Sequence, residues 1–263
     1  MDHLEVGRLW DGNAEAWTQM ARAGYDLCRD KVNTPAFMEM LPDVSGLSGL
    51  DIGCGEGNNT RLVARRGARM TALDVSPKFV RFAREAEAAE PLGISYYVAS
   101  ALELPFADAG FDFAMATMSF MDFPEQDRAL REAHRVLRPG GFLQFSICHP
   151  CFSTTRWRWL RDENGERTGV ECGDYFSPPL PHVETWSFGS APEEIREQHP
   201  EFRTAYFSRT LSWWLNAILD AGFVLERFVE PCPEEKTAEE CPYVADMRIV
   251  AFTLIVRGRK PGE

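Results

Sequence analysis

The sequence predicts an α/β protein built around one parallel sheet that is doubly wound, with helices on both faces. Short apolar runs alternate with helical stretches from about residue 48 to residue 148, and the alternation resumes after residue 207. Such alternation produces parallel strands joined by right-handed helical crossovers. The chain has 263 residues and is 44% hydrophobic, which suffices for one large core. We therefore expect a single domain over residues 1–263.

The first part of the sheet is predicted as a cofactor-binding core over residues 48–148. Helices are expected at 58–66, 77–89 and 124–137, and Pro77 stands at a first-turn position where proline is favoured. The turn at 138–141, Arg-Pro-Gly-Gly, closes the last of these helices. The apolar runs that predict strands lie at residues 50–52, 69–73, 94–98, 111–116 and 142–148.

Two further segments flank this core. Residues 1–47 are expected to be helical, with an amphipathic helix over 13–30 that has Asn13 as its N-cap. Residues 208–263 are expected to complete the sheet. They supply a helix at 208–221 and apolar runs at 223–228 and 247–256.

The β-α rhythm breaks between residues 149 and 207. This segment is rich in aromatic residues, proline and glycine, and no helical stretch stands out in it. An insertion of this length in an α/β chain is typical of a lid or binding loop. We expect a substrate lid whose aromatic walls suit an apolar or aromatic small molecule, although most of these side chains would also serve as the core of the lid itself. The same walls would also suit a cage for a cationic acceptor.

Charge and composition exclude several classes of partner. The formal net charge of −12 argues against nucleic acid and against an anionic membrane surface. No apolar stretch is long enough for a transmembrane helix and the first residues are no secretory signal, so we expect a cytoplasmic location. Cys148 and Cys151 have CxxC spacing, but no second pair accompanies them, so a zinc or redox role is disfavoured.

The most informative segment is the loop at residues 50–60, Leu-Asp-Ile-Gly-Cys-Gly-Glu-Gly-Asn-Asn-Thr. Alternate glycines between a strand and a helix make a tight turn that a ligand can approach closely. Asp74 ends the next strand, where a carboxylate suits two ribose hydroxyls. A nicotinamide-binding loop would read GxGxxG, whereas this one reads GxGxG. Asp51 before the turn would repel a pyrophosphate and suits a ligand with positive charge.

These residues resemble motifs I and II of the class I S-adenosylmethionine-dependent methyltransferases of the small-molecule, methyltransferase type 11-like kind. The stretches Leu-Pro-Phe at 104–106, Arg-Val-Leu-Arg-Pro-Gly-Gly at 135–141 and Ala-Gly-Phe at 221–223 also resemble the family at its spacing. The resemblance implies a Rossmann-like sheet of seven strands whose last strand is antiparallel. It also implies S-adenosylmethionine as methyl donor and S-adenosylhomocysteine as product.

The resemblance implies a set of cofactor-binding residues. Asp51, Gly53 and Gly55 would flank the methionine part, and Asp74 would bind the ribose. Ser100 departs from the family, which often has Asp at this position. The predicted set is Asp51, Gly53, Cys54, Gly55, Asn59, Asp74, Val75, Ser100, Ala101, Leu102 and Thr117.

The residues that would bind the methyl acceptor or act on it are less well defined by the sequence. His149 follows the strand at 142–148 and is the leading candidate for a base or a substrate-binding group. Tyr25 and Asp122 are further catalytic candidates, and His182 and His199 are weaker ones. No ligand cluster for a metal stands out, so we expect a metal-free, in-line displacement.

Three rival functions remain open at this point. The fold could use a bound sulfonium for chemistry other than methyl transfer, or bind it without catalysis. It could also methylate RNA or protein, although net charge disfavours RNA. A nicotinamide-dependent oxidoreductase is disfavoured by Asp51 and by the missing GxGxxG. Neither the methylated atom nor the oligomeric state follows from the sequence.

Overall fold

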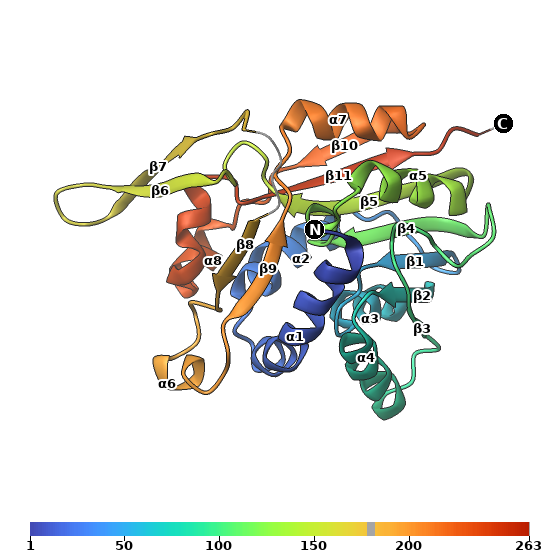
Figure 1. Ribbon diagram of the computed structural model, residues 1–263, viewed down its shortest axis with the longest axis horizontal. Helices are drawn as coiled ribbons and strands as arrows, with labels where there is room; N and C mark the ends of the chain where they lie inside the picture. Colours follow the sequence, from blue (N-terminus) through green and yellow to red (C-terminus); the bar gives the residue numbers. More distant parts are fainter. Residues whose placement is uncertain (178–181, 263) are drawn as a thin grey trace.

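A seven-stranded sheet forms the centre of the protein in the order β10-β11-β5-β4-β1-β2-β3 (Figure 1). The structure is a computed structural model that describes residues 1–177 and 182–262. Strand β11 pairs antiparallel with both of its neighbours, whereas the pairs from β5 to β3 are parallel. The predicted mostly parallel sheet with an antiparallel last strand is confirmed. Its strands are β1 (Ser48–Ile52), β2 (Arg69–Asp74), β3 (Ser95–Val98), β4 (Phe111–Thr117), β5 (Leu137–Cys148), β10 (Val224–Val229) and β11 (Thr253–Arg259).

Helices cover both faces of this sheet, so it is doubly wound as predicted. Helices α5 (Gln126–Val136) and α7 (Leu211–Asp220) pack on one face. Helices α2 (Thr34–Met40), α3 (Asn58–Arg65) and α4 (Pro77–Ala89) pack on the other. Successive residues of a strand point to opposite faces, and in β4 they join these two cores alternately. Burial on both faces explains why four successive residues of β4, Phe113–Ala116, are apolar and fully buried.

The N-terminal helix differs from the prediction. Helix α1 spans His3–Arg22 rather than 13–30, because Asp2 caps it. The Asp2 side chain accepts from the backbone N–H of Glu5, and the Glu5 carboxylate accepts from the backbone N–H of Asp2. Asn13 lies in the middle of α1 and not at its start. A one-turn π-helix η1 (Arg29–Asn33) then leads directly into α2.

The insertion forms two separate antiparallel ribbons rather than a continuation of the sheet. The hairpin of β6 (Arg156–Arg161) and β7 (Arg167–Gly173) extends away from the sheet, while the ribbon of β8 (His182–Trp186) and β9 (Phe202–Tyr206) lies beside α1 (Figure 1). Asn13 fixes that second ribbon, because its side-chain amide donates to the Arg203 carbonyl and accepts from the Arg203 N–H, both at 2.9 Å. One helical turn, α6 (Glu193–Arg196), lies between β8 and β9.

The C-terminal part also departs from the prediction in one place. The apolar run at 247–256 is not one strand, because the 3₁₀ helix η3 (Pro242–Arg248) takes its start and β11 continues to Arg259. The remaining short elements are η2 (Phe120–Asp122) and α8 (Glu235–Glu240). None of the described helices combines the length and the apolar character that a membrane crossing requires.

Candidate functional site

A cavity of about 670 Å³ lies at the carboxyl ends of the parallel strands. Its lining includes Gly53 after β1, Asp74 at the end of β2, Ser100 after β3, Thr117 at the end of β4 and Cys148 at the end of β5. Ligands in open α/β sheets bind at this edge. Helix α1, the β8–β9 ribbon and the segment before β11 contribute the other walls.

The glycine loop after β1 needs glycine for two different reasons. Gly53 and Gly57 have φ of +79° and +87°, and a Cβ on either would lie within 3 Å of Ser119 or Tyr96 respectively. Gly55 has φ of +56°, and a Cβ there would meet no protein atom within 4 Å. Gly53 and Gly57 therefore let the loop pack closely against the rest of the protein. Gly55 leaves an open backbone position beside the cavity for a ligand.

Asp74 is held rigidly at the rim of this loop. Its two carboxylate oxygens accept from the backbone N–H groups of Gly55 and Ser76, each at 2.9 Å. Burial raises the pKa of Asp74 to about 6, although these backbone donors oppose the shift. The carboxylate therefore faces the cavity in a fixed orientation, as a ribose-binding group must.

Asp51 is placed behind the loop rather than in the cavity lining. It is fully buried, and one of its oxygens accepts from the Thr60 hydroxyl at 2.6 Å. Its other oxygen, Oδ1, has no hydrogen-bond partner among the described residues. Burial raises the pKa of Asp51 to about 7. An unsatisfied buried acceptor of this kind calls for a donor from a ligand or a water.

The structure brings the other predicted cofactor residues together around the cavity. Asn59 is fixed from two sides, because its amide donates to the Thr117 hydroxyl at 2.9 Å and accepts from the Thr34 hydroxyl at 3.0 Å. These bonds join the helix after the glycine loop to the end of β4 and to α2. The predicted residues that line the cavity are Gly53, Cys54, Gly55, Asn59, Asp74, Val75, Ser100, Ala101, Leu102 and Thr117.

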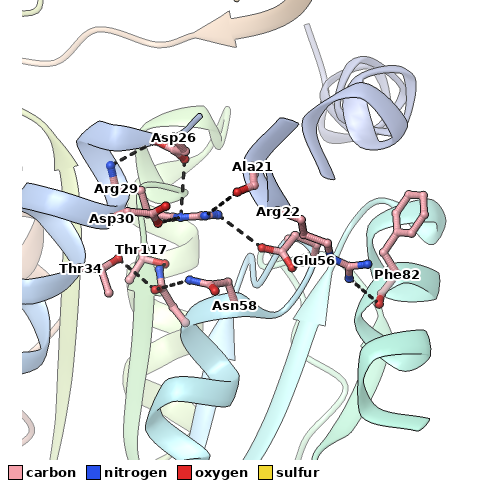
Figure 2. A network of polar contacts seen from close by, with 12 residues as sticks. Ala21, Arg22, Asp26, Arg29, Asp30, Thr34, Glu56, Asn58, Phe82 and Thr117 are labelled. Carbon is pink, nitrogen blue, oxygen red and sulfur yellow. Dashed lines mark hydrogen bonds and ion pairs between the residues drawn. The ribbon is translucent and has the colours of Figure 1, made fainter. Parts of the chain in front are cut away.

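An arginine that the sequence analysis missed lies at the loop end of the cavity (Figure 2). The Arg29 guanidinium contacts Asp30 at 2.7 Å, Glu56 at 3.4 Å and Asp26 at 3.8 Å. Arg29, Glu56 and Asp26 line the cavity with charges of both signs, which suits the zwitterionic end of an amino acid. Arg29 begins the π-helix η1, and such local distortions of a helix are frequent at functional sites.

Two of the three predicted catalytic residues also line the cavity. Tyr25 lies between α1 and η1, and Asp122 closes η2 just beyond β4. Asp122 is only 7% exposed, and burial raises the pKa of its carboxyl well above the usual value, with the charges of Glu184 and Asp74 adding to the shift. Burial beside a cavity is an environment in which the acid–base groups of active sites are often found.

His149 lies outside the cavity lining. Its Nδ1 accepts from the Cys151 N–H at 3.2 Å, so a neutral ring has its proton on Nε2, which lies 2.8 Å from Glu230. Both ring nitrogens are thus used to brace the chain after β5. His182 pairs with Glu184 at 2.9 Å, and neither His182 nor His199 lines the cavity.

The cysteines are free thiols in this structure. Burial raises the pKa of Cys148 to about 12, so its thiol stays protonated and unreactive at neutral pH. Within the described ranges, no group of three or more His, Cys, Asp or Glu side chains is arranged to hold a metal ion.

Comparisons with known proteins agree with this geometry. Residues 50–145 match the family model of a methyltransferase domain. The chain is 33% identical over 132 residues to malonyl-[acyl-carrier protein] O-methyltransferase of Pectobacterium atrosepticum, covering 50% of this chain and 51% of that protein. It is 32% identical over 143 residues to demethylmenaquinone methyltransferase of Thermobifida fusca, covering 54% and 60% respectively. The matched part thus spans little more than half the length of these curated relatives.

Solved structures extend the likeness to nearly the whole fold. An S-adenosylmethionine-dependent methyltransferase from Mesorhizobium loti superposes with a TM-score of 0.70 at 28% identity, covering 86% of this chain and 96% of that one. An N-methyltransferase from Burkholderia thailandensis, solved with S-adenosylhomocysteine bound, shares the fold at 16% identity and a TM-score of 0.59, covering 99% and 91%. Residues 50–145 are thus similar to a methyltransferase domain, and the described fold is that of S-adenosylmethionine-dependent methyltransferases.

Proposed function

We propose that this protein transfers a methyl group from S-adenosylmethionine to a small organic molecule held in the same cavity. One observation supports this most directly: the glycine loop, Asp74 and Asp122 line one cavity, which α1 and the insertion help to enclose. A volume of about 670 Å³ lies within the range of about 300–1,000 Å³ that small-molecule sites occupy. We further propose that the insertion acts as a lid over the acceptor.

The residues present fit the cofactor part by part. Asp74 would hold the ribose hydroxyls, and Val75, Ala101 and Leu102 supply apolar surface for the adenine. The open backbone at Gly55 admits the methionine part. The unpaired Oδ1 of Asp51 would accept, through a water if needed, from its ammonium group. When bound, the cofactor supplies an activated methyl group on a sulfonium.

The role of the protein in such a displacement is alignment, exclusion of water and removal of a proton. Orientation of two reactants can lower a barrier by about 7–11 kcal/mol. Asp122 is the carboxyl group we propose as the proton acceptor, and we propose Tyr25, which also lines the cavity, as a positioning residue. We propose a bracing role for His149, because both of its nitrogens are already engaged.

The test has two stages. Calorimetry should show S-adenosylhomocysteine binding to the wild type, and binding should be lost in Asp74→Ala. Formation of S-adenosylhomocysteine should then be followed with a library of small acceptors, with mass spectrometry of the product to distinguish methyl transfer from other sulfonium chemistry. An intact Asp74-dependent cofactor site that methylates only a protein or RNA would contradict the small-molecule proposal.

A further inference from the structure

Two acidic side chains, those of Asp122 and Glu184, line the part of the cavity that is not made by the predicted cofactor residues. We call this part the acceptor end and define it by Asp122, Cys148, Glu184 and Tyr206, which all line the cavity. The four groups lie on neighbouring elements, because β8 pairs with β9 and η2 lies against both β5 and β9. They come from η2, β5, β8 and β9.

The carboxyl group of Asp122 has no hydrogen-bond donor within the described structure. Its side chain is more than nine-tenths buried and lines the cavity, and none of the described residues donates a hydrogen bond to it. Tyr206 cannot serve this purpose, because its hydroxyl donates to the Ser153 carbonyl at 2.8 Å. Burial raises the pKa of this carboxyl, and a ligand that brings a positive charge and a donor next to it would favour its charged form.

A second buried acceptor lines the same cavity. The Asn33 amide nitrogen donates to the Ser146 hydroxyl at 3.1 Å, which directs the role of acceptor to its Oδ1. That oxygen is buried and has no partner among the described residues. Asn33 Oδ1 is therefore a buried hydrogen-bond acceptor that a donor from a ligand would satisfy.

No basic side chain of the described residues forms an ion pair with Asp122. Of the described basic side chains, His3 and Arg29 line the cavity, and neither forms a hydrogen bond or ion pair with Asp122 or Glu184. The Arg29 guanidinium is already surrounded by three carboxylates. His182 pairs with Glu184 at 2.9 Å from outside the lining. An anionic acceptor would thus meet Asp122, with which no described basic side chain forms an ion pair.

Aromatic rings supply the rest of the walls around these carboxylates. Phe152, Trp157, Trp186 and Phe252 line the cavity, and their ring faces attract cations as well as apolar surface. The combination of aromatic walls with two carboxylates is typical of sites for organic cations.

We propose that the methyl acceptor is an alkyl amine that carries an aromatic ring and is protonated in water, with its N–H groups received by Asp122 and with Glu184 as a further acidic group in the lining. This inference rests on the proposed function, because it names the substrate class of the same cavity. The ammonium first gives a proton to water or to a carboxylate. The nitrogen lone pair then bonds to the methyl carbon, the carbon–sulfur electrons stay on sulfur, and a second N–H proton leaves through Asp122. Acceptors that are carboxylates are excluded by the same charges.

Three probes with one ring system test this choice: 1-naphthylmethylamine, 1-naphthylmethanol and 1-naphthoic acid. Binding of each would be measured by calorimetry with S-adenosylhomocysteine present, in wild type, Asp122→Asn and the control Asp127→Asn. Asp127 lies on the exposed side of α5 and pairs with Arg131, so its change leaves the cavity intact. Glu184→Gln is a second cavity variant in case Asp122→Asn does not fold.

We expect the amine to bind wild type at least about tenfold more tightly than the acid. Asp122→Asn should weaken binding of the amine by about tenfold and strengthen binding of the acid. Asp127→Asn should leave both affinities unchanged. The amine should also yield S-adenosylhomocysteine faster than the alcohol. Equal or tighter binding of the acid, an unchanged order in Asp122→Asn, turnover of the alcohol alone, or no binding of any probe would overturn the inference. Failure of S-adenosylhomocysteine itself to bind would instead overturn the proposed function.

Discussion

The glycine loop after β1 and the insertion after β5 shape the same cavity, yet they are held in place by different means. The loop is fixed by local backbone geometry: Gly53 and Cys54 both donate to the Leu73 carbonyl at 2.9 Å, and the glycines adopt positive φ. The insertion is fixed by distant partners, chiefly Asn13 of α1 and the ring of Trp17. The comparison teaches that the proposed cofactor site is built largely by short segments, whereas the proposed acceptor end depends on contacts between distant parts of the chain.

The largest effect is expected at the cofactor end. Asp74→Ala should weaken S-adenosylhomocysteine binding by at least about 100-fold, because two hydrogen bonds to a charged carboxylate are lost at about 1.5–3 kcal/mol each. Calorimetry measures it, with Asp127→Ala on the exposed surface as the control. Unchanged affinity would show that the loop and Asp74 do not form the cofactor site.

The two kinds of glycine in the loop should separate stability from binding. Gly53→Ala should lower the free energy of unfolding by about 2–4 kcal/mol, because positive φ and the close contact with Ser119 both oppose a Cβ. Gly55→Ala should lower the free energy of unfolding by less than Gly53→Ala does, yet weaken binding of S-adenosylhomocysteine by about tenfold or more. Urea unfolding and calorimetry distinguish the two, and an equal loss of stability in both variants would contradict this division.

Removing the tie between α1 and the insertion should act on the other region. Asn13→Ala breaks both hydrogen bonds to Arg203 and should cost about 1–3 kcal/mol. Hydrogen exchange should show faster exchange of the Arg203 N–H and its neighbours in β9, with the amides of β1 unchanged. Protection that stays the same in β9 would mean that aromatic packing alone holds the ribbon.

Buried acids should make the protein less stable as the pH rises. The pKa of Asp51 is raised to about 7 by burial, so the folded chain keeps a proton that the unfolded chain loses near pH 4. The contribution of this group to the free energy of unfolding is fully present below about pH 4 and falls as the pH rises to about 7. Asp51→Asn should reduce the loss between pH 5 and pH 8 by an amount on the order of 1–3 kcal/mol, measured by urea unfolding. An identical pH slope in both proteins would refute this.

The smallest effect is expected at a glycine that needs no special geometry. Gly12 lies inside α1, and a Cβ there would meet nothing within 4 Å. Gly12→Ala should raise the free energy of unfolding by about 0.5–1 kcal/mol through helix propensity. A loss of stability would indicate that the exposed side of α1 contacts something else.

Much of the sheet could be predicted from the sequence, because each strand and crossover helix has its own periodicity and turn signals. The helix start at Asp2 was missed, although Asp2 and Glu5 have the spacing of a capping box. The run at 247–256 was assigned to one strand, since periodicity alone cannot separate a buried strand from an apolar 3₁₀ turn. In the site, Arg29 was missed because its role depends on Glu56, 27 residues further along.

The sequence by itself determined the doubly wound sheet, the glycine loop and the position of Asp74, because backbone conformation and strand order follow from local patterns. Only the tertiary structure decided which side chains share the acceptor end. His149 follows β5 in the sequence, yet its ring turns to Glu230, whereas Asp122 and Glu184, 62 residues apart, line one cavity. Long-range packing of α1 against the β8–β9 ribbon fixes that arrangement, and no local pattern in the chain encodes it.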